Sequence, residues 1–339
     1  MNKRHTLVFL LGTATTLGLL SLAFIDINPK KTIHGFNLVA PRVQFSIDSL
    51  KSIQQLGAGW IAVVPYAFCD PESGAVVYGN GKQWWGETPE GIATTIQMAH
   101  SLGLKVMLKP HLWVKGQGWA GDLDFDDEKE WVHWETQYSA YIATYAKIAA
   151  AQCIEMFCIG TEVRKSTKKR STFWVSMIED IRKEYQGSLT YAANWDEFEE
   201  VDFWDKLDFI GVDAYFPISS DKTPEIETLQ VAWEIPKKKL QVISEKFNRP
   251  MLFTEYGYES VDYPTIGHWN VNKDTLDVNF EAQSNSFEAL YLSFKDEDWW
   301  VGGFVWKWHL DRRGNHMRTI KEYTPQDKPA LKTIEKYFK

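Results

Sequence analysis

The sequence predicts a single (β/α)8 barrel, and three observations indicate this fold. Eight short apolar runs bounded by turn residues recur along residues 33–308. Helix-like segments lie between most of these runs, so that strands and helices alternate as they do around a parallel sheet. Segments that lead from a helix into a strand are short, whereas those that lead from a strand into a helix are long, which is typical of a barrel with its functional site at one end.

The predicted strands are near-continuous apolar runs, as expected for strands that are covered on both faces. They span residues 33–38, 60–66, 105–111, 156–162, 189–195, 209–215, 251–255 and 303–308.

The first well-delimited helix begins with Thr88 as its N-cap and Pro89 at its first position, and Gly103 ends it. The chain between the fifth and sixth strands is short, and its helix is expected near residues 197–206. Other helices are predicted over residues 131–151, 172–185, 225–247 and 279–295, and the long connections that follow strands cover residues 69–87, 112–130 and 256–278.

The first part of the chain has the pattern of an export signal. Lys3 and Arg4 precede a mostly apolar stretch over residues 6–25. That stretch is also long enough to remain as one membrane anchor. We therefore predict a signal peptide or signal anchor over residues 1–31 and the barrel over residues 32–339, with the barrel outside the cytoplasm. The exported protein could be extracellular, periplasmic or attached to the membrane through this segment only.

The overall composition argues against several classes of function. A net charge of −8 without a basic stripe argues against nucleic-acid binding. The chain contains 16 Trp, 14 Tyr and 19 Phe, and flat aromatic rings suit both core packing and stacking on sugars. Cys69, Cys153 and Cys158 are too few and too poorly spaced for a disulfide scaffold or a Cys-x-x-Cys metal site.

Two glutamates close strand-like runs. Glu162 ends the run over residues 156–162, and Glu255 ends the run over residues 251–255. They are 93 residues apart (255 − 162), which is three βα units at about 31 residues each, so they belong to strands 4 and 7. Both carboxylates should therefore lie at the C-terminal mouth of the barrel, where active sites of this fold are built.

Enzymes that hydrolyse glycosidic bonds typically use two carboxyl groups that face each other. In a retaining mechanism one carboxylate attacks the sugar, and the other protonates the leaving oxygen and then activates water. The acid must keep its proton near neutral pH, so we expect the pKa of Glu162 to be raised more than that of Glu255. Tyr215, next to Glu255, could donate a hydrogen bond that keeps the nucleophile ionised. A single glutamate at a strand end would more simply form a structural salt bridge, but two at the required strands favour catalysis.

Three motifs resemble glycoside hydrolase family 113, which belongs to the large clan A of retaining barrel enzymes. They are GTEVR at residues 160–164, TEYGYES at 254–260 and GFVWKW at 303–308. The resemblance extends over residues 34–337. It implies an endo-acting β-1,4-mannanase that needs no cofactor, with Glu162 as the acid/base and Glu255 as the nucleophile. Many clan A enzymes carry Asn directly before the acid/base, whereas this chain has Thr161.

Further polar and aromatic residues end the predicted strands and are candidates for sugar binding. Trp306 and Trp308 share one face of the last strand unless a bulge intervenes, and we favour Trp306 as the platform under the reacting sugar. The Trp residues of the long loops (84, 85, 113, 119 and 269) should border a groove that is open at both ends, and Asp213 is a further acid of these strands. The substrate-binding candidates are Asn37, Tyr66, His111, Trp113, Asn194, Trp195, Tyr215, Trp306 and Trp308.

Three other functions compete with this one. A metal-dependent hydrolase would need clustered histidines, and the eight histidines include no His-x-His or His-Glu-x-x-His pattern, so no metal is expected. A non-catalytic sugar-binding barrel would keep the aromatic residues and lose a carboxylate. A retaining hydrolase or transglycosylase of another β-linked glycan, such as a glucan or chitosan, stays open because mannose and glucose differ only at C2.

Overall fold

The computed structural model describes residues 32–339 except for residues 80, 82 and 312–318. The export segment expected over residues 1–31 lies outside the described part. Within that part, no helix combines the length and the apolar character needed to cross a bilayer. All three cysteines are free.

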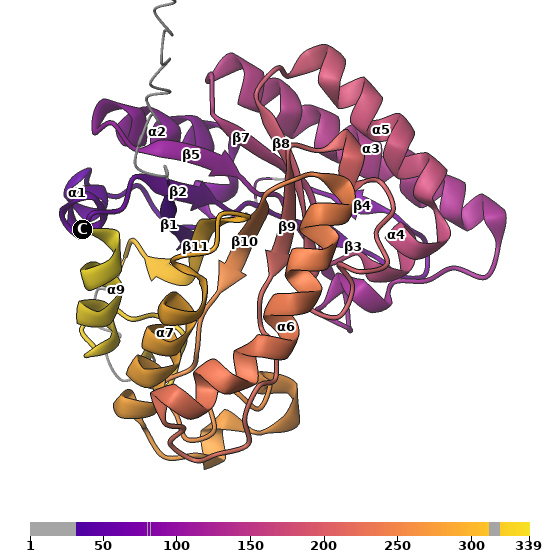
Figure 1. Ribbon diagram of the computed structural model, residues 1–339. Coiled ribbons are helices and arrows are strands. Elements are labelled where there is room, and N and C mark those ends of the chain that lie inside the picture. The colour runs from indigo at the N-terminus through magenta and orange to yellow at the C-terminus, as the bar shows by residue number, and fades with distance from the viewer. Residues whose placement is uncertain (1–31, 80, 82, 312–318) are drawn as a thin grey trace, which may run out of the picture. The chain divides into compact units, whose positions relative to one another are not determined.

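Eight parallel strands close into a barrel with helices around it (Figure 1), which confirms the predicted fold class. The barrel closes because the first strand pairs in parallel with both the second and the last. In order around the barrel the strands are β1 (Ile33–Val39), β11 (Trp300–His309), β10 (Met251–Tyr256), β9 (Phe209–Asp213), β8 (Ser188–Asn194), β7 (Met156–Thr161), β5 (Lys105–Leu108) and β2 (Trp60–Val63).

A second, three-stranded sheet corrects the prediction for strands 2 and 3. The apolar runs over residues 60–66 and 105–111 do not form single strands, because Pro65 and Pro110 interrupt them. Proline lacks the N–H that a central strand must donate. The chain leaves the barrel at these points and continues as β3 (Tyr66–Cys69) and β6 (His111–Val114), which pair in parallel, while β4 (Val76–Val77) pairs antiparallel with β3.

The helices over the barrel agree with the sequence pattern to within a few residues. Thr88 caps α2, with its hydroxyl accepting from the Gly91 N–H at 3.1 Å, and Asp127 and Asn279 cap α3 and α7 in the same way. The helices are α1 (Asp48–Gln55), α2 (Pro89–Ser101), α3 (Glu128–Ala151), α4 (Arg164–Lys169), α5 (Ser171–Glu184), α6 (Ile226–Phe247), α7 (Phe280–Phe294) and α9 (Ala330–Phe338), with 3-10 turns η1 (Trp85–Glu87), η2 (Ala120–Asp122), η3 (Trp204–Lys206), η4 (His268–Asn270) and η5 (Lys273–Thr275).

The helix expected near residues 197–206 is wrong, since only the short turn η3 forms there. Glu197 is the physical reason. Its side chain is 1 % exposed and accepts hydrogen bonds from Thr167, Tyr191 and the Asn194 N–H. These bonds bend the chain around a buried carboxylate, which competes with a regular helix.

Alternation along the strands decides which side chains face the barrel interior. A cluster made almost wholly of strand residues (Ile33, Ala62, Val64, Met107, Met156, Cys158, Ala192, Leu252 and Phe304) is separate from the large core that joins strands to helices. Since residues two apart share a face, this small cluster fills the barrel. By the same alternation Lys109 follows Met107 on the interior face.

Each of three strands carries one extra residue near its C-terminal end. In β7, the four residues 158–161 pair with only three residues of β8, 190–192. In β10, residues 253 to 255 match 212 to 213 of β9, and in β11, residues 305 to 308 match 36 to 38 of β1. An extra residue in one strand of a pair re-aims the side chains that follow. Glu162 directly follows β7, Glu255 lies in β10 and Trp306 lies in β11.

Candidate active site

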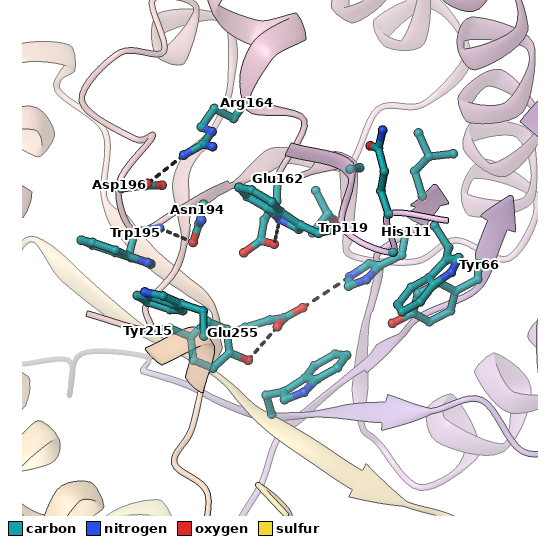
Figure 2. A pocket seen from close by; sticks show the side chains of 18 of the residues that line it. Tyr66, His111, Trp119, Glu162, Arg164, Asn194, Trp195, Asp196, Tyr215 and Glu255 are labelled. Atoms are coloured by element: carbon teal, nitrogen blue, oxygen red, sulfur yellow. Dashed lines mark hydrogen bonds and ion pairs between the residues drawn. The ribbon is translucent and has the colours of Figure 1, made fainter. Parts of the chain in front are cut away.

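A cavity of about 900 Å³ lies at the C-terminal end of the barrel. Glu162 and Glu255 both line it, which confirms that the two strand-end carboxylates reach one site (Figure 2). Seven of the nine proposed sugar-binding residues also line the cavity, namely Tyr66, His111, Trp113, Asn194, Trp195, Tyr215 and Trp306.

Asn37 and Trp308 lie outside the cavity lining, contrary to the expectation that they would contact a sugar. Asn37 is fully buried, and its amide donates to the backbone carbonyls of Thr254 at 3.1 Å and Phe304 at 3.2 Å. It therefore ties β1 to β11, its neighbour, and to β10, the next strand around the barrel. Trp308 is also buried and packs on the Phe36 ring at 4.9 Å.

The extra residue in β11 separates the two tryptophans. Because it falls between Val305 and Trp308, Trp306 and Trp308 no longer share a face. Trp306 turns toward the cavity and lies parallel to the His111 ring, with centroids 5.9 Å apart. The peptide bond between Trp306 and Lys307 is cis. Of the two candidates for a sugar platform, only Trp306 is placed to serve.

Glu255 is held as a carboxylate by a ring of donors. Tyr215 donates to its Oε2 at 2.8 Å, and the His111 Nε2 lies 3.3 Å from its Oε1 (Figure 2). The Lys109 ammonium donates to that same Oε1. Burial alone would raise the pKa of Glu255, but the charge of Lys109 and the nearby His111 outweigh it and lower this pKa to about 2.

Lys109 and Asp213 form a buried ionic cluster with Glu255. The Lys109 Nζ lies 3.1 and 3.3 Å from the two Asp213 oxygens, and both side chains are inaccessible to solvent. Thr254 donates to Asp213 at 2.7 Å. Burial and the charge of Glu255 raise the pKa of Asp213 to about 7, although Lys109 opposes this. The extra residue in β10 lets consecutive residues, Thr254 and Glu255, both reach this cluster.

Glu162 has the opposite electrostatic environment. Burial raises the pKa of its carboxyl group well above the usual value, and the charges of Asp213 and Glu255 raise it further. Lys109 and the indole N–H of Trp119, which donates to Oε2 at 2.6 Å, counteract these effects in part. The backbone at Glu162 is left-handed, with φ of 52°, and its N–H bonds to the Ala192 carbonyl at 2.8 Å. Such a conformation is rare for a residue with a Cβ and occurs preferentially at functional sites.

The two glutamates therefore differ in protonation across one cavity. Burial and the neighbouring carboxylates raise the pKa of Glu162, whereas Lys109 and His111 lower that of Glu255 to about 2, so Glu162 keeps its proton to a higher pH than Glu255 does. This confirms the expectation that the pKa of Glu162 is raised more. An acid and an anion that face one cavity can protonate a leaving oxygen and attack the carbon that it leaves.

Aromatic residues line the cavity beyond the carboxylates. Trp195 and Trp269 stack with centroids 5.5 Å apart and contribute to one wall. A second cavity of about 690 Å³ includes Trp84 and shares Tyr66, Trp113 and Trp306 with the first, so the two adjoin. Trp84, Trp113 and Trp269 are 42 %, 50 % and 48 % exposed. Trp85, in contrast, packs edge-on against the core residue Phe45 and lines neither cavity.

Sequence reasoning missed several residues of the site. Lys109 was hidden within an apolar run, although a lysine directly after four strand residues and before Pro110 is an unusual signal. Tyr323 and Asp196 line the cavity from segments whose pattern gave no such indication, and Arg164 belongs to the GTEVR motif but had no role assigned to it. Trp119 was expected as a wall residue, but its hydrogen bond to Glu162 could not be read from its position.

Two carboxyl groups with oppositely shifted pKa values at the mouth of one barrel are typical of enzymes that cleave glycosidic bonds. The comparisons with known proteins place the chain among the glycoside hydrolases. The chain belongs to Glycoside Hydrolase Family 113, whose family model matches residues 39–328. This confirms the resemblance seen in the three sequence motifs.

Solved structures share the fold of this chain. The GH113 β-mannanase AaManA from Alicyclobacillus acidocaldarius, solved in complex with ManMIm, is 25 % identical with a TM-score of 0.79, and the match covers 91 % of this chain and 97 % of that one. A GH113 β-1,4-mannanase complex shares the fold at 23 % identity and a TM-score of 0.77, covering 91 % and 99 %. A β-glucuronidase from Ruminococcus gnavus shares it at 13 % identity and 0.64, covering 91 % of this chain and 50 % of that one. No curated protein sequence matches the chain.

Proposed function

We propose that this glycoside hydrolase is an endo-β-1,4-mannanase that works by double displacement, with Glu162 as acid/base and Glu255 as nucleophile. The observation that carries the proposal is the opposite displacement of the two pKa values within one cavity. The GH113 β-mannanase that is 25 % identical supports mannan as the substrate.

In the first step the Glu255 carboxylate attacks the anomeric carbon while Glu162 gives its proton to the leaving oxygen. The bond from that carbon to the leaving oxygen breaks, and an ester to Glu255 forms. Tyr215 and Lys109 hold both Glu255 oxygens, which fixes the direction of attack. Trp306, parallel to His111, offers the flat surface on which the reacting sugar can stack.

In the second step Glu162 must act as a base, and the site provides the reason why it can. The negative charge of Glu255 is one of the causes that raise the pKa of Glu162. Once Glu255 is an ester, that charge is gone and the pKa of Glu162 falls. Glu162 then takes a proton from water, and the hydroxide that attacks the anomeric carbon releases Glu255 again.

Thr161 is proposed to take the place of the asparagine that many clan A enzymes carry before the acid/base. Its Oγ1 is buried at the cavity wall, where it meets the Cys158 thiol, a weak hydrogen-bonding group. A buried hydroxyl with so weak a partner gains when a ligand supplies an oxygen. A sugar hydroxyl beside Glu162 would do so. We propose Asn194 as a second contact for a sugar hydroxyl, since it lines the same cavity.

The experiment that tests this function is a substrate panel. Purified protein is incubated with mannan, glucomannan, β-glucan and chitosan, and new reducing ends and product lengths are measured. We expect mannan to be cleaved internally, with a mixture of oligosaccharides early in the reaction and retention of the anomeric configuration by NMR. Release of mannose alone would refute endo action, and preference for glucan or chitosan would establish the alternative substrate class.

Export of the protein is a separate proposal that rests on residues 1–31 alone. We propose that this segment directs the barrel out of the cytoplasm, either as a cleaved signal or as the only membrane attachment. Cell fractionation followed by N-terminal sequencing tests it. Protein that accumulates in the cytoplasm with an intact N-terminus would refute it.

A further inference from the structure

Arg164 lies two residues after the proposed acid/base and faces the same cavity. Its guanidinium donates to Asp196 at 2.9 Å and to Asp122 at 2.9 Å, using different nitrogens (Figure 2 shows the first of these). Asp122 belongs to the loop after β6 and Asp196 to the loop after β8, so Arg164 links two segments around the active site. These bonds fix the plane of the guanidinium, which a single contact would leave free to rotate.

The fixed guanidinium lies over the indole of Trp119, with its central carbon 4.8 Å from the ring centroid. Gly121 also packs closely on this indole, since a Cβ at that position would lie only 2.2 Å from a ring carbon. Trp119 is therefore held in place by Arg164 and by the backbone at Gly121. The indole N–H of the ring so held donates to Glu162 Oε2 at 2.6 Å (Figure 2).

We infer that Arg164 is a positioning residue for general acid catalysis, which acts on Glu162 through the Trp119 indole. The inference rests on the proposed function, because it assumes that Glu162 is the acid. Arg164 itself transfers no proton.

The protonation of the Glu162 carboxyl group explains why the position of the Trp119 indole matters. An indole N–H only donates, so it requires Glu162 Oε2 to be the unprotonated oxygen of the carboxyl group. The proton is then left on Oε1. A general acid is effective only when its proton lies within hydrogen-bond reach of the leaving oxygen. By holding the indole, Arg164 determines which oxygen carries the proton and where it points.

The charged surroundings do not provide this effect by themselves. The groups that face Arg164 are the acids Asp122, Asp196 and Glu197, which attract it from two segments, the loop after β6 and the loop after β8. They hold the guanidinium and do not contact Glu162 in place of Trp119. The hydrogen bond from Trp119 lowers the pKa of Glu162, so weakening it should raise that pKa.

Three variants separate positioning from charge. Arg164→Lys keeps the charge but lacks the planar fork that spans two aspartates and stacks on the ring. Trp119→Phe keeps a ring but loses the N–H. Gly121→Ala keeps Arg164 and displaces the ring, and its backbone has no positive φ that would strain alanine. Each folded variant is assayed with mannan and with an aryl β-mannoside whose strongly acidic phenol leaves without protonation.

We expect all three variants to lose about tenfold or more in kcat/KM on mannan, which needs an acid, and less than about twofold on the activated aryl substrate. The alkaline limb of the mannan pH profile should move to higher pH in each. Arg164→Lys should add little in the Trp119→Phe background, because both changes break the same chain of contacts. If Arg164→Lys fails to fold, Gly121→Ala tests the same inference, because it displaces the Trp119 indole and keeps Arg164.

Equal losses on the two substrates would overturn the inference, since they would show that Arg164 binds sugar directly. Additive losses in the double variant would overturn it as well. Wild-type protein that cleaves neither substrate would overturn the proposed function itself, a result distinguishable from both.

Discussion

Replacing Lys109 with methionine tests the buried cluster that holds the nucleophile. Methionine has about the same length and removes only the charge and the donors. In the wild type the ammonium contacts Asp213 at 3.1 and 3.3 Å and also contacts Glu255, and all three side chains are buried. The variant leaves two carboxyl groups facing each other in the barrel without a cation.

The size of the loss follows from the burial of the cluster. Removing one partner of a buried ion pair typically costs about 3–5 kcal/mol of unfolding free energy. Lys109 is one of the groups that lower the pKa of Glu255 against the effect of burial, so its loss also raises the free energy of the Glu255 carboxylate. We therefore expect Lys109→Met to lower the unfolding free energy by about 3 kcal/mol at neutral pH.

The pH dependence of this loss has a definite sign. Because the pKa of Glu255 is lower in the folded than in the unfolded chain, its ionic contacts stabilise the fold above about pH 4.5 and are lost as the pH falls toward 2. The deficit of Lys109→Met should therefore be largest at neutral pH and shrink in acid. The acidic limb of kcat/KM should also move to higher pH, because Glu255 would ionise later.

The assay is urea unfolding at pH 7 and pH 4, together with a pH profile of mannan hydrolysis. Lys168→Met is the matched control, since Lys168 pairs with Glu200 at 2.9 Å on the surface, where both side chains are about half exposed. An exposed pair contributes about 0–1 kcal/mol. If Lys109→Met were as stable at pH 7 as Lys168→Met, or if its acidic limb did not move, the assigned role of the cluster would be refuted.

Three further predictions concern the cavity. Tyr215→Phe removes a 2.8 Å charged hydrogen bond to Glu255, so kcat/KM should fall by roughly tenfold and the acidic limb should move up; an unshifted limb would contradict this. Glu162→Gln should abolish mannan hydrolysis and raise Tm relative to wild type at pH 8 but not at pH 4. The pKa of Glu162 is raised in the folded protein, so its ionised form destabilises the fold once the pH exceeds 4.5, its pKa in the unfolded chain. A gain in Tm that does not depend on pH would exclude that cause. Trp113→Ala should raise KM with little change in Tm, because Trp113 is exposed at the cavity. Trp308→Ala should lower the unfolding free energy by about 3–5 kcal/mol, because Trp308 is buried in the core. The reverse pattern would show that Trp308 contacts the sugar and Trp113 does not.

Much of the fold could be predicted because each barrel strand carries its own local signal. Apolar runs, caps such as Thr88 and the stop at Gly103 were sufficient for the strand count and most helices. The extent of strands 2 and 3 was wrong because hydrophobicity continues through Pro65 and Pro110, while the hydrogen-bond ladder does not. The helix near residues 197–206 was wrong because the Glu197 carboxylate is buried and accepts a hydrogen bond from Thr167, 30 residues earlier in the chain, which no local pattern reveals.

The site was predictable only where strand position decides it. Glu162 and Glu255 follow from counting strands, but the side-chain directions depend on extra residues in β7, β10 and β11. One such residue in β11 brings Trp306 to the cavity and sends Trp308 to the core. The role of Lys109 depends on partners more than 100 residues away in the sequence, Asp213 and Glu255, and their pairing exists only in the closed barrel.

The shared ammonium of Lys109 has a consequence for the covalent intermediate. Esterification of Glu255 would strip this inaccessible cation of one counter-ion. Asp213 already lies 3.1 and 3.3 Å from this cation, so the ammonium keeps one counter-ion while Glu255 is esterified. The loss of the Glu255 charge also removes one of the causes that raise the pKa of Asp213, which favours the ionised form of Asp213 during the covalent stage.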